Sequence, residues 1–424
     1  MTVTSALSLP RSQPATLTGG LWPDLPRGAD PLPGDLEQWL ARRASDMIAL
    51  RRHLHAHPEP SHQEFRTASL VASELTAAGL RPRMLPAGNG VICDVGEGDR
   101  VVALRADLDA LPLQDVKDVE YRSTVPGVTH ACGHDVHTTV LLWTGRALAR
   151  LARQRRLPGR VRLLFQPAEE SMPSGAPKVI DAGGLKDVAA IFSLHCAPRL
   201  ATGEVGVRSG PFTAATDKVE VTLTGPGGHT ARPQLTVDLV HALGRLVVDV
   251  PALLSRRVDP RAAVSLVFGS IHAGEAPNAI PGVGTVQGTV RVLGREAWRS
   301  APELITELIQ SVVAGTGARA ETTYTRGVPP VVNDPAATEV VAAAARSAVG
   351  RDRVTEAELS MGGEDFAFYL EHVPGAMVRL GTGIEGAEPM DIHQASFDVD
   401  ERCIGHGVRL MVHTALRALT TDLL

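Results

Sequence analysis

Apolar and polar positions recur along the chain with two different periods, and these periods separate it into regions. Between residues 35 and 54 apolar residues recur at helical spacing, and a second helical pattern covers 67–78. Further on, apolar runs predict buried strands at 101–104, 161–165 and 189–194. A helix is predicted between the first two, at 138–152. Alternation of strands and helices predicts an α/β domain with a largely parallel central sheet flanked by helices.

The pattern changes near residue 213. Residues 218–224 alternate polar and apolar side chains, with the period of a half-exposed strand. More strands and two helices are predicted after it, at 264–268 and 284–293 for the strands and 236–254 and 301–315 for the helices. Two helices interleaved with alternating strands predict a smaller α+β unit that is inserted into the first domain.

These regions give four expected segments. Residues 1–34 contain six prolines and no regular period, so they are expected to form an N-terminal arm, either flexible or strapped over the surface. Residues 35–212 and 329–424 are expected to form the two parts of the larger domain, and 213–328 the inserted unit. The Ala-rich stretch after residue 330 and the C-terminal stretch are expected to be helical.

The composition narrows the class of protein. Of 424 residues, 44% are apolar and 21% charged, which argues against disorder and fibrous repeats. The formal charge of -5 argues against a broad basic face for nucleic acid or an acidic membrane. No apolar run has the ~18 to 20 residues of a bilayer span, and the N-terminus lacks a signal-peptide pattern, which together predict a cytoplasmic protein. Its four cysteines form no C-x-x-C pair and are expected to be free thiols.

The segment 130–137, His-Ala-Cys-Gly-His-Asp-Val-His, is the strongest chemical signal. It places three imidazoles, a thiol and a carboxylate in eight positions, and these are ligands of zinc and neighbouring metals. An extended backbone would project Cys132 and His134 to the same side. A polar loop with incidental histidines is the alternative, and the density of ligand types favours a metal site.

Two adjacent acids, Glu169 and Glu170, follow the predicted strand 161–165. Adjacent side chains point in different directions, so one carboxylate can bind metal while the other accepts a proton from a water whose pKa the metal lowers to about 7.

Other ligand-type side chains are also expected at strand ends. Asp107, Asp109 and His195 follow predicted strands, and His393 is a late imidazole that can close the site. In an open α/β sheet the carboxyl ends of the strands share one crevice.

These residues resemble the amidohydrolase branch of the aminoacylase and carboxypeptidase metallohydrolases, which includes hippurate hydrolases, N-acyl-amino-acid amidohydrolases and auxin-conjugate hydrolases. The resemblance spans about residues 45 to 415. It rests on seven motifs in the same order and spacing, at 52–59, 105–112, 130–137, 166–170, 227–229, 278–281 and 363–366.

The resemblance implies a role for each matching residue. It implies two divalent metal ions, of zinc, manganese, cobalt or nickel, with the ligands Cys132, His134, Glu170, His195 and His393. It implies that Glu169 is the general base and that His229, in a lid domain, reaches the site across a dimer and stabilises the oxyanion. Asp109 is implied to orient a group beside the metals. Asp107, where the wider family has a histidine ligand, is expected to support the ligands from behind. Asn278 and Arg291 are implied to hold the substrate carboxylate.

The resemblance also implies a function. The larger domain would be catalytic, and segment 213–328 would be a lid and homodimerisation domain. The activity would be hydrolysis of the amide bond of N-acyl amino acids or related small amides by a two-metal-activated water. Three alternatives stay open: a dipeptidase or exopeptidase on the same scaffold, a non-catalytic metal-binding protein, and a hydrolase that uses Cys132 as a covalent nucleophile.

Overall fold

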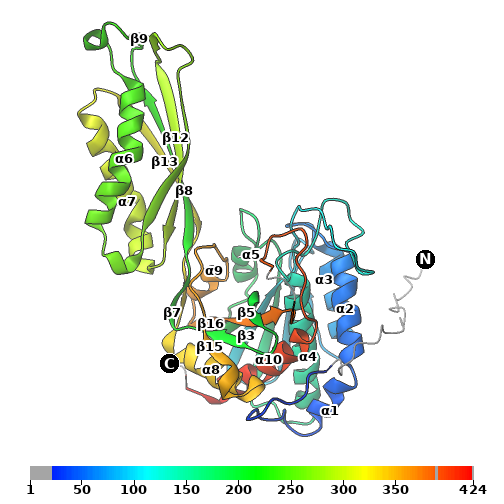
Figure 1. The fold of residues 1–424 in the computed structure, drawn as a ribbon. Helices are drawn as coiled ribbons and strands as arrows, with labels where there is room; N and C mark the ends of the chain where they lie inside the picture. The colour runs from blue at the N-terminus through cyan, green and yellow to red at the C-terminus, as the bar shows by residue number, and fades with distance from the viewer. Residues whose placement is uncertain (1–21, 387–389, 423–424) are drawn as a thin grey trace.

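The computed structural model describes residues 22–386 and 390–422, which form a larger and a smaller body (Figure 1). The larger body is built on an eight-stranded sheet. Its strands, in spatial order, are β1 (Arg83–Met84), β2 (Val91–Gly96), β4 (Arg160–Gln166), β3 (Val101–Asp107), β5 (Val188–Ala201), β16 (Gly375–Gly383), β6 (Val205–Val207) and β15 (Val354–Glu356).

The centre of this sheet is parallel. Strands β4, β3, β5 and β16 run in the same direction, whereas β2 pairs antiparallel with β4 at one side and β6 pairs antiparallel with β16 at the other. The carboxyl ends of the four central strands therefore lie along one edge. This arrangement confirms the predicted α/β class with a largely parallel central sheet.

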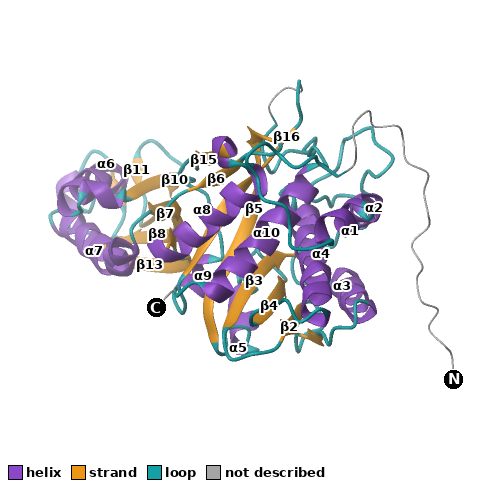
Figure 2. Ribbon diagram, turned by 90° about the horizontal axis from the view of Figure 1, so that it is seen from below, coloured by secondary structure: helices purple, strands orange, loops and turns teal. Residues whose placement is uncertain are grey.

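Helices cover both faces of the sheet. The helices of the larger body are α1 (Leu36–Ala41), α2 (Ala44–Ala56), α3 (Phe65–Ala77), α4 (His134–Arg153), α5 (Ala176–Asp181), α8 (Pro335–Val349), α9 (Ala367–Leu370) and α10 (Cys403–Thr420). Helices α4, α8 and α10 lie side by side over one face (Figure 2). Successive residues of β3 point to opposite faces: Val102 and Leu104 belong to the core under these helices, and Val101 and Ala103 to a second core with α5 and α9. Burial on both faces explains why the strand is apolar throughout.

The smaller body is an antiparallel sheet with two helices on one face. Its main strands, in spatial order, are β10 (Ser265–Ala273), β12 (Val283–Val292), β8 (Ala215–Thr224) and β13 (Arg319–Val328). Helices α6 (Leu239–Arg257) and α7 (Arg295–Ala314) cover it, and their apolar stripes pack against Val219, Val221 and Leu223 of β8. The alternate residues of β8 are more exposed, which explains its polar and apolar alternation. This is the predicted smaller α+β unit.

Short strands complete the two bodies. They are β7 (Gly210–Thr213) with β14 (Val331–Asn333), near the passage between the bodies, and β9 (Gly228–His229) with β11 (Ala279–Ile280), at the far end of the smaller body (Figure 1).

Several predicted elements have different bounds in the structure. The helical stretch 35–54 is broken between α1 and α2, because the backbone leaves the helix at Arg42 and Arg43. Helix α4 begins at His134 instead of residue 138, so the ligand segment is partly helical. Strand β5 continues to Ala201, so the expectation that His195 ends this strand is wrong: Cys196 after it is still buried, and the strand becomes exposed only from Arg199 onward.

The chain before α1 lies on the larger body where the structure describes it. The guanidinium of Arg409 on α10 lies over the Trp22 ring, 4.8 Å from the ring centroid, and Leu32 is buried in the main core. Residues 22–34 are thus a strap, and the prediction for residues 1–21 falls outside the described residues. Among the described residues, no helix has both the length and the apolar character needed to cross a membrane.

Candidate metal centre

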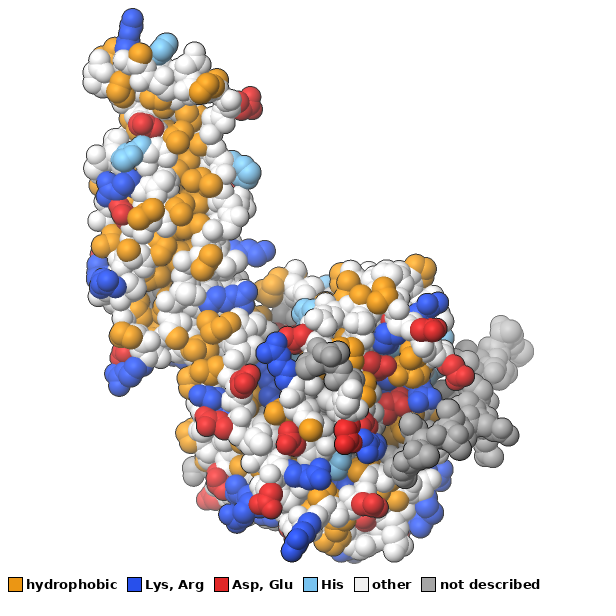
Figure 3. Space-filling view, viewed as in Figure 1, with side chains coloured by type: hydrophobic (Ala, Val, Ile, Leu, Met, Phe, Trp, Pro, Cys, Tyr) orange, Lys and Arg blue, Asp and Glu red, His pale blue; other side chains and the backbone are white. Residues whose placement is uncertain are grey.

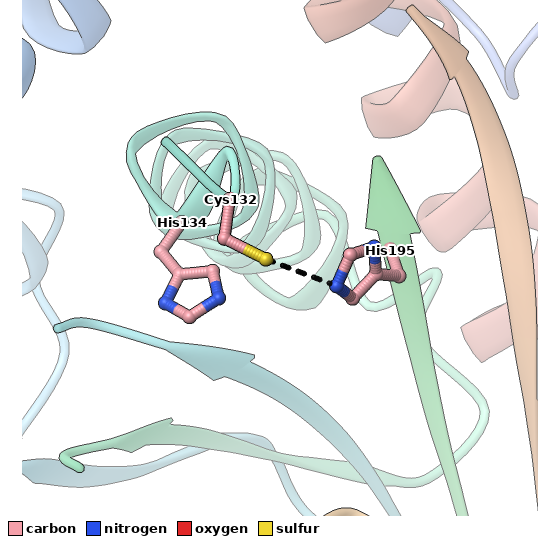
Figure 4. A group of neighbouring side chains, drawn as sticks. All are labelled: Cys132, His134 and His195. Atoms are coloured by element: carbon pink, nitrogen blue, oxygen red, sulfur yellow. Dashed lines mark hydrogen bonds between the residues drawn. The ribbon is translucent and has the colours of Figure 1, made fainter. Parts of the chain in front are cut away.

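The start of α4 presents two of the predicted ligands. Cys132 and His134 flank Gly133, whose φ of 84° is left-handed. A Cβ on Gly133 would lie 2.7 Å from the Cys196 sulfur, so the turn requires glycine on two grounds. The expected extended backbone is therefore wrong here: a left-handed turn into a helix brings the two side chains together. Figure 4 shows both of them beside His195 of β5.

Hydrogen bonds fix which nitrogen of each imidazole faces the centre. His134 Nδ1 lies 2.8 Å from the carbonyl of Asp109, and His195 Nδ1 lies 2.8 Å from that of Cys196. A carbonyl only accepts, so both Nδ1 atoms carry the proton and both Nε2 atoms present lone pairs, as in metal-binding histidines. His195 Nε2 is 3.5 Å from Cys132 Sγ. His134 Nε2 is buried and has no hydrogen-bond partner among the described residues, so the site fits a cation.

The adjacent acids are positioned by one carboxylate. Asp109 accepts the backbone N–H of Glu169 and of Glu170, each at 3.0 Å. The preceding residue, Ala168, has a φ of 51°, so the chain turns sharply after β4. As a result, both carboxylates lie near the same imidazole nitrogen: Glu169 Oε2 is 4.0 Å and Glu170 Oε1 is 3.9 Å from His134 Nε2.

His393 approaches from the other side. Its Nε2 is 3.1 Å from Glu170 Oε1, and its backbone N–H donates to the carbonyl of Ala131 at 2.7 Å. The ligand-type atoms form overlapping sets, each within 4.8 Å: Cys132, His134 and His195; Cys132, Glu170 and His393; and His134, Glu169 and Glu170. Cys132, His134 and Glu170 each belong to two of these sets, so neighbouring sets share ligand-type atoms.

The electrostatics of this cluster favour cations. Burial, together with the neighbouring Glu170, raises the pKa of the Cys132 thiol well above its usual value. Burial and the nearby Glu364 also raise the pKa of Glu169 well above the ordinary range. A divalent cation stabilises the deprotonated thiolate and carboxylates, so binding of cations and loss of protons are coupled here.

A second layer of side chains supports the candidate ligands. The sequence predicted Asp107 in this layer, whereas Arg105 and His137 were not assigned from it. The Asp107 carboxylate accepts from Arg105 Nη1 at 2.6 Å and from His137 Nδ1 at 2.7 Å. His137 Nε2 in turn accepts the N–H of Cys196 at 2.9 Å, which anchors the strand next to His195. Asp107 thus lies behind the ligands. The signal for His137 and Arg105 was their presence in the 130–137 and 105–112 motifs.

The remaining predicted residues lie on the smaller body. His229 and Asn278 are exposed and adjacent at its far end: Thr230 N donates to Asn278 O at 3.3 Å. Figure 1 shows β9, which carries His229, far from the larger body. Arg291 is at the near end of β12, where its Nη1 donates to Thr216 Oγ1 at 3.0 Å and to the carbonyl of Met361. Within one chain, Arg291 therefore lies near the predicted ligands, whereas His229 and Asn278 lie far from them.

An open cavity of about 450 Å³ joins these groups. It lies between the two bodies, and its lining includes Cys132, Glu169, Glu170, His195, Arg291, Glu364, Arg379 and His393. A cluster of thiol, imidazole and carboxylate ligands at the carboxyl edge of an α/β sheet, with one further acid beside it, defines a metal-dependent hydrolase of the two-cation class.

Comparison with known proteins identifies the family. Residues 103–417 match peptidase family M20/M25/M40, and the chain belongs to this family. A crystal structure described as a dinuclear metal-binding peptidase of the M20 family, from Bacillus subtilis, superposes with a TM-score of 0.78 at 34% identity. That match covers 89% of this chain and 98% of the other. The predicted family resemblance is thus confirmed.

Relatives by sequence agree with the family. The N-acetyl-L-cysteine deacetylase of Bacillus subtilis (strain 168) is 36% identical over 90% of each chain. A Rhodococcus jostii (strain RHA1) protein named "Putative glutamate--cysteine ligase 2-3" is 48% identical over 86% of this chain. This chain spans about half of that relative, 46% of its length.

Proposed function

We propose that this protein is a metal-dependent amidohydrolase that cleaves the amide bond of N-acyl amino acids or related small amides. The observation that carries the proposal is Glu169, an acid whose side chain is only 8% exposed, which lies beside the ligand cluster and is held in place through its backbone by Asp109. The similarity to a deacetylase of an N-acyl amino acid supports this substrate class.

The proposed ligands of two divalent cations are Cys132, His134, Glu170, His195 and His393. Thiolate and imidazole ligands favour zinc, and manganese, cobalt and nickel also accept this donor set. Such cations supply Lewis acidity, which polarises a carbonyl and lowers the pKa of water. Cys132 would be one of the residues that hold the cations, because its sulfur lies close to ligand-type atoms of two sets. Its position among ligands makes it a metal ligand instead of a covalent nucleophile.

Glu169 is proposed to move the proton. It accepts a proton from the attacking water, the water oxygen bonds to the acyl carbon, and the carbon–nitrogen bond breaks. Glu169 then delivers the same proton to the leaving nitrogen, so the products are a carboxylic acid and an amine. Asp109 and Asp107 are proposed to fix the positions of the acids and imidazoles through hydrogen bonds. Arg291 is proposed to bind the substrate carboxylate.

His229 is proposed to act in the site of a second copy, with Asn278 next to it. Within one chain both lie at the far end of the smaller body, so a homodimer through this body is the arrangement that brings them to a metal centre. The end strand β10 leaves Val267 and Ile271 exposed, at 63% and 50%, and apolar side chains gather along this body (Figure 3). An unpaired edge with apolar side chains is suited to pairing with a second chain. The smaller body is thus a proposed lid and dimerisation domain.

A cytoplasmic location is part of the proposal. All four cysteines are free and buried, and the ligand role of Cys132 requires a reduced thiol.

The decisive experiment is Glu169→Gln, assayed on a panel of N-acyl amino acids together with metal analysis. We expect kcat to fall by about 10² to 10⁴, the usual contribution of a general base, with metal content near that of the wild type. Glu339→Gln, at an exposed position on α8, is the control and should keep full activity. A fully active Glu169→Gln protein would overturn the proposal. Free dipeptides in the same panel test the peptidase alternative, and activity that survives chelation would return Cys132 to the role of nucleophile.

Mixing two inactive variants tests the dimer. His229→Ala and Glu169→Gln damage different parts of a shared site, so a mixed dimer regains one intact site. Random exchange of equal amounts should restore about a quarter of the wild-type sites, because half of the dimers are mixed. No recovery after exchange, verified by subunit labelling, would place His229 outside the site of the partner.

A further inference from the structure

Arg379 is a cation at the cavity that forms no ion pair among the described residues, and the acid that acts on it most is Glu364. It lies on β16, directly beside His195 of β5 in the parallel register. Its side chain lines the same cavity as Cys132 and Glu169, and its guanidinium lies 4.9 Å from the centroid of the buried Phe212 ring. Among the described residues, no acid lies within ion-pair distance of this guanidinium and no side-chain hydrogen bond holds it.

Three fully buried arginines of this body, in contrast, each have an acidic partner. Arg51 contacts Asp135 at 2.8 Å, Arg105 contacts Asp107 at 2.6 Å, and Arg409 contacts Glu37 at 2.8 Å. A charge removed from water without a partner is costly, so buried arginines are normally paired, whereas Arg379 is partly buried and has no ion-pair partner among the described residues. The pKa values differ in the same way: paired acids raise those of Arg51 and Arg105 well above the usual value, whereas for Arg379 the loss of hydration lowers the pKa more than the nearby Glu364 raises it.

The topology shows which part of a substrate Arg379 can reach. Strands β4, β3, β5 and β16 follow one another in the sheet. Glu169 follows β4, and the acids nearest to it include Glu364 and Asp365. Arg379 is on β16, beyond His195. Since Glu169 must reach the leaving nitrogen, the amine half of the substrate faces the β4 side and the acyl half faces the β16 side.

We infer that Arg379 is a specificity-determining residue that binds a carboxylate on the acyl group of the substrate. The inference rests on the proposed function and refines it: the substrates would be N-acyl amino acids whose acyl chain ends in an acid. A guanidinium offers two parallel N–H donors to a carboxylate, which suits it to this recognition. The α-carboxylate of the amino acid is separate and faces the lid, where Arg291 lies.

The test compares two substrates that differ only in charge. An N-succinyl amino acid and its N-succinamoyl counterpart have the same shape, but only the first has a terminal carboxylate. For the metal-loaded wild type we expect kcat/KM to be at least tenfold higher on the succinyl substrate, the usual scale of a charged hydrogen bond. Arg379→Met should remove this preference and keep turnover of the succinamoyl substrate, and Arg379→Lys should keep part of it.

Controls separate this role from a structural one. Arg346→Met, which removes an arginine on α8 that pairs with Glu339, should leave the preference unchanged. Arg379→Gln is the second variant if Arg379→Met does not fold. Two results would overturn the role of Arg379: equal kcat/KM of the wild-type protein on the two substrates, or an equal loss of kcat/KM on both substrates in the variants. Either result would leave the amidohydrolase proposal standing.

A binding measurement makes the inference independent of turnover. Calorimetric titration of the metal-loaded protein with succinate and with succinamate should show at least tenfold tighter binding of succinate. Arg379→Met should bind the two equally. This result would support the role of Arg379 in binding even if no amide in the panel were hydrolysed. Absence of hydrolysis would count against the proposed function. Equal binding of the two acids by the wild type would refute the role of Arg379.

Discussion

Glu64 is a buried acid whose ionisation is expected to set the pH dependence of stability. Its side chain is fully buried behind the loop that carries Glu169, the proposed general base. Oε1 accepts the backbone N–H of His62 and of Ala168, both at 2.8 Å, and Oε2 accepts from Asn89 Nδ2 at 2.9 Å. Burial, with a further contribution from Asp109, raises its pKa from 4.5 to about 7.

The perturbation is Glu64→Gln, which should be tolerated. The amide oxygen can accept from His62 and Ala168 as before. The Asn89 amide can turn so that its Oδ1, which now has no partner among the described residues, accepts from the new amide nitrogen. The variant therefore keeps the hydrogen bonds and removes only the charge.

The sign and size of the expected change in stability follow from the pKa of Glu64 in the unfolded and in the folded protein. In the folded protein the pKa is raised, so the stability due to protonated Glu64 is complete below pH 4.5 and is lost as the pH rises through about 7. The shift corresponds to about 3 kcal/mol at pH 8. Relative to the wild type, Glu64→Gln should thus gain about 3 kcal/mol in unfolding free energy between pH 4 and pH 8.

The assay is urea unfolding of both metal-free proteins at pH 4, 6 and 8, with the difference in unfolding free energy as the readout. Metal-free protein is used because metal binding has its own pH dependence. Glu339→Gln, at an exposed site, should show no such trend. A Glu64→Gln difference that is the same at pH 4 and pH 8 would refute the reasoning and show that the three donors keep Glu64 ionised.

Three other changes have definite expected outcomes. Gly133→Ala should lower the unfolding free energy by about 2 kcal/mol or more and reduce bound metal, because the new Cβ meets Cys196 at a left-handed φ; calorimetry and metal analysis measure both. Leu243→Ala, in the core of the smaller body, should cost about 2 to 5 kcal/mol in urea unfolding. Removing metal with a chelator should lower the thermal midpoint, and adding metal back should restore it, because cations bind only the folded ligand cluster.

Regular patterns made most of the fold predictable. The apolar runs of β3, β4 and β5 and the alternating residues of β8 carry their period in the sequence. Strands β13 and β16 were not predicted, for opposite reasons. Residues 319–328 form an end strand with mostly polar side chains, so no apolar run marks them. Residues 375–383 are buried, but their glycines and Arg379 interrupt the run.

The site was predictable where ligand types are close together in sequence. The cluster at 130–137 and the acids Glu169 and Glu170 are of this kind, and the structure places them together. The support of Asp107 by Arg105 and His137 depends on side-chain direction across neighbouring elements, which spacing does not reveal. Likewise, nothing in the sequence shows that His229 lies at the far end of its body, because that depends on the length of β8 and β12.

The charges around the cavity are arranged along the sheet, and this arrangement matches the proposed reaction. Glu169 lies close to Glu364 and Asp365, whose charge Arg105 balances in part, and Arg379, which forms no ion pair among the described residues, lies on β16. The amine product becomes an ammonium ion, which the acids favour, and an acidic acyl product carries negative charge, which Arg379 favours. A substrate bound in the reverse direction would place its acyl carboxylate among the acids. In the proposed binding mode, the charges that would select an acidic acyl group would therefore also set the direction in which the amide lies across the candidate ligands.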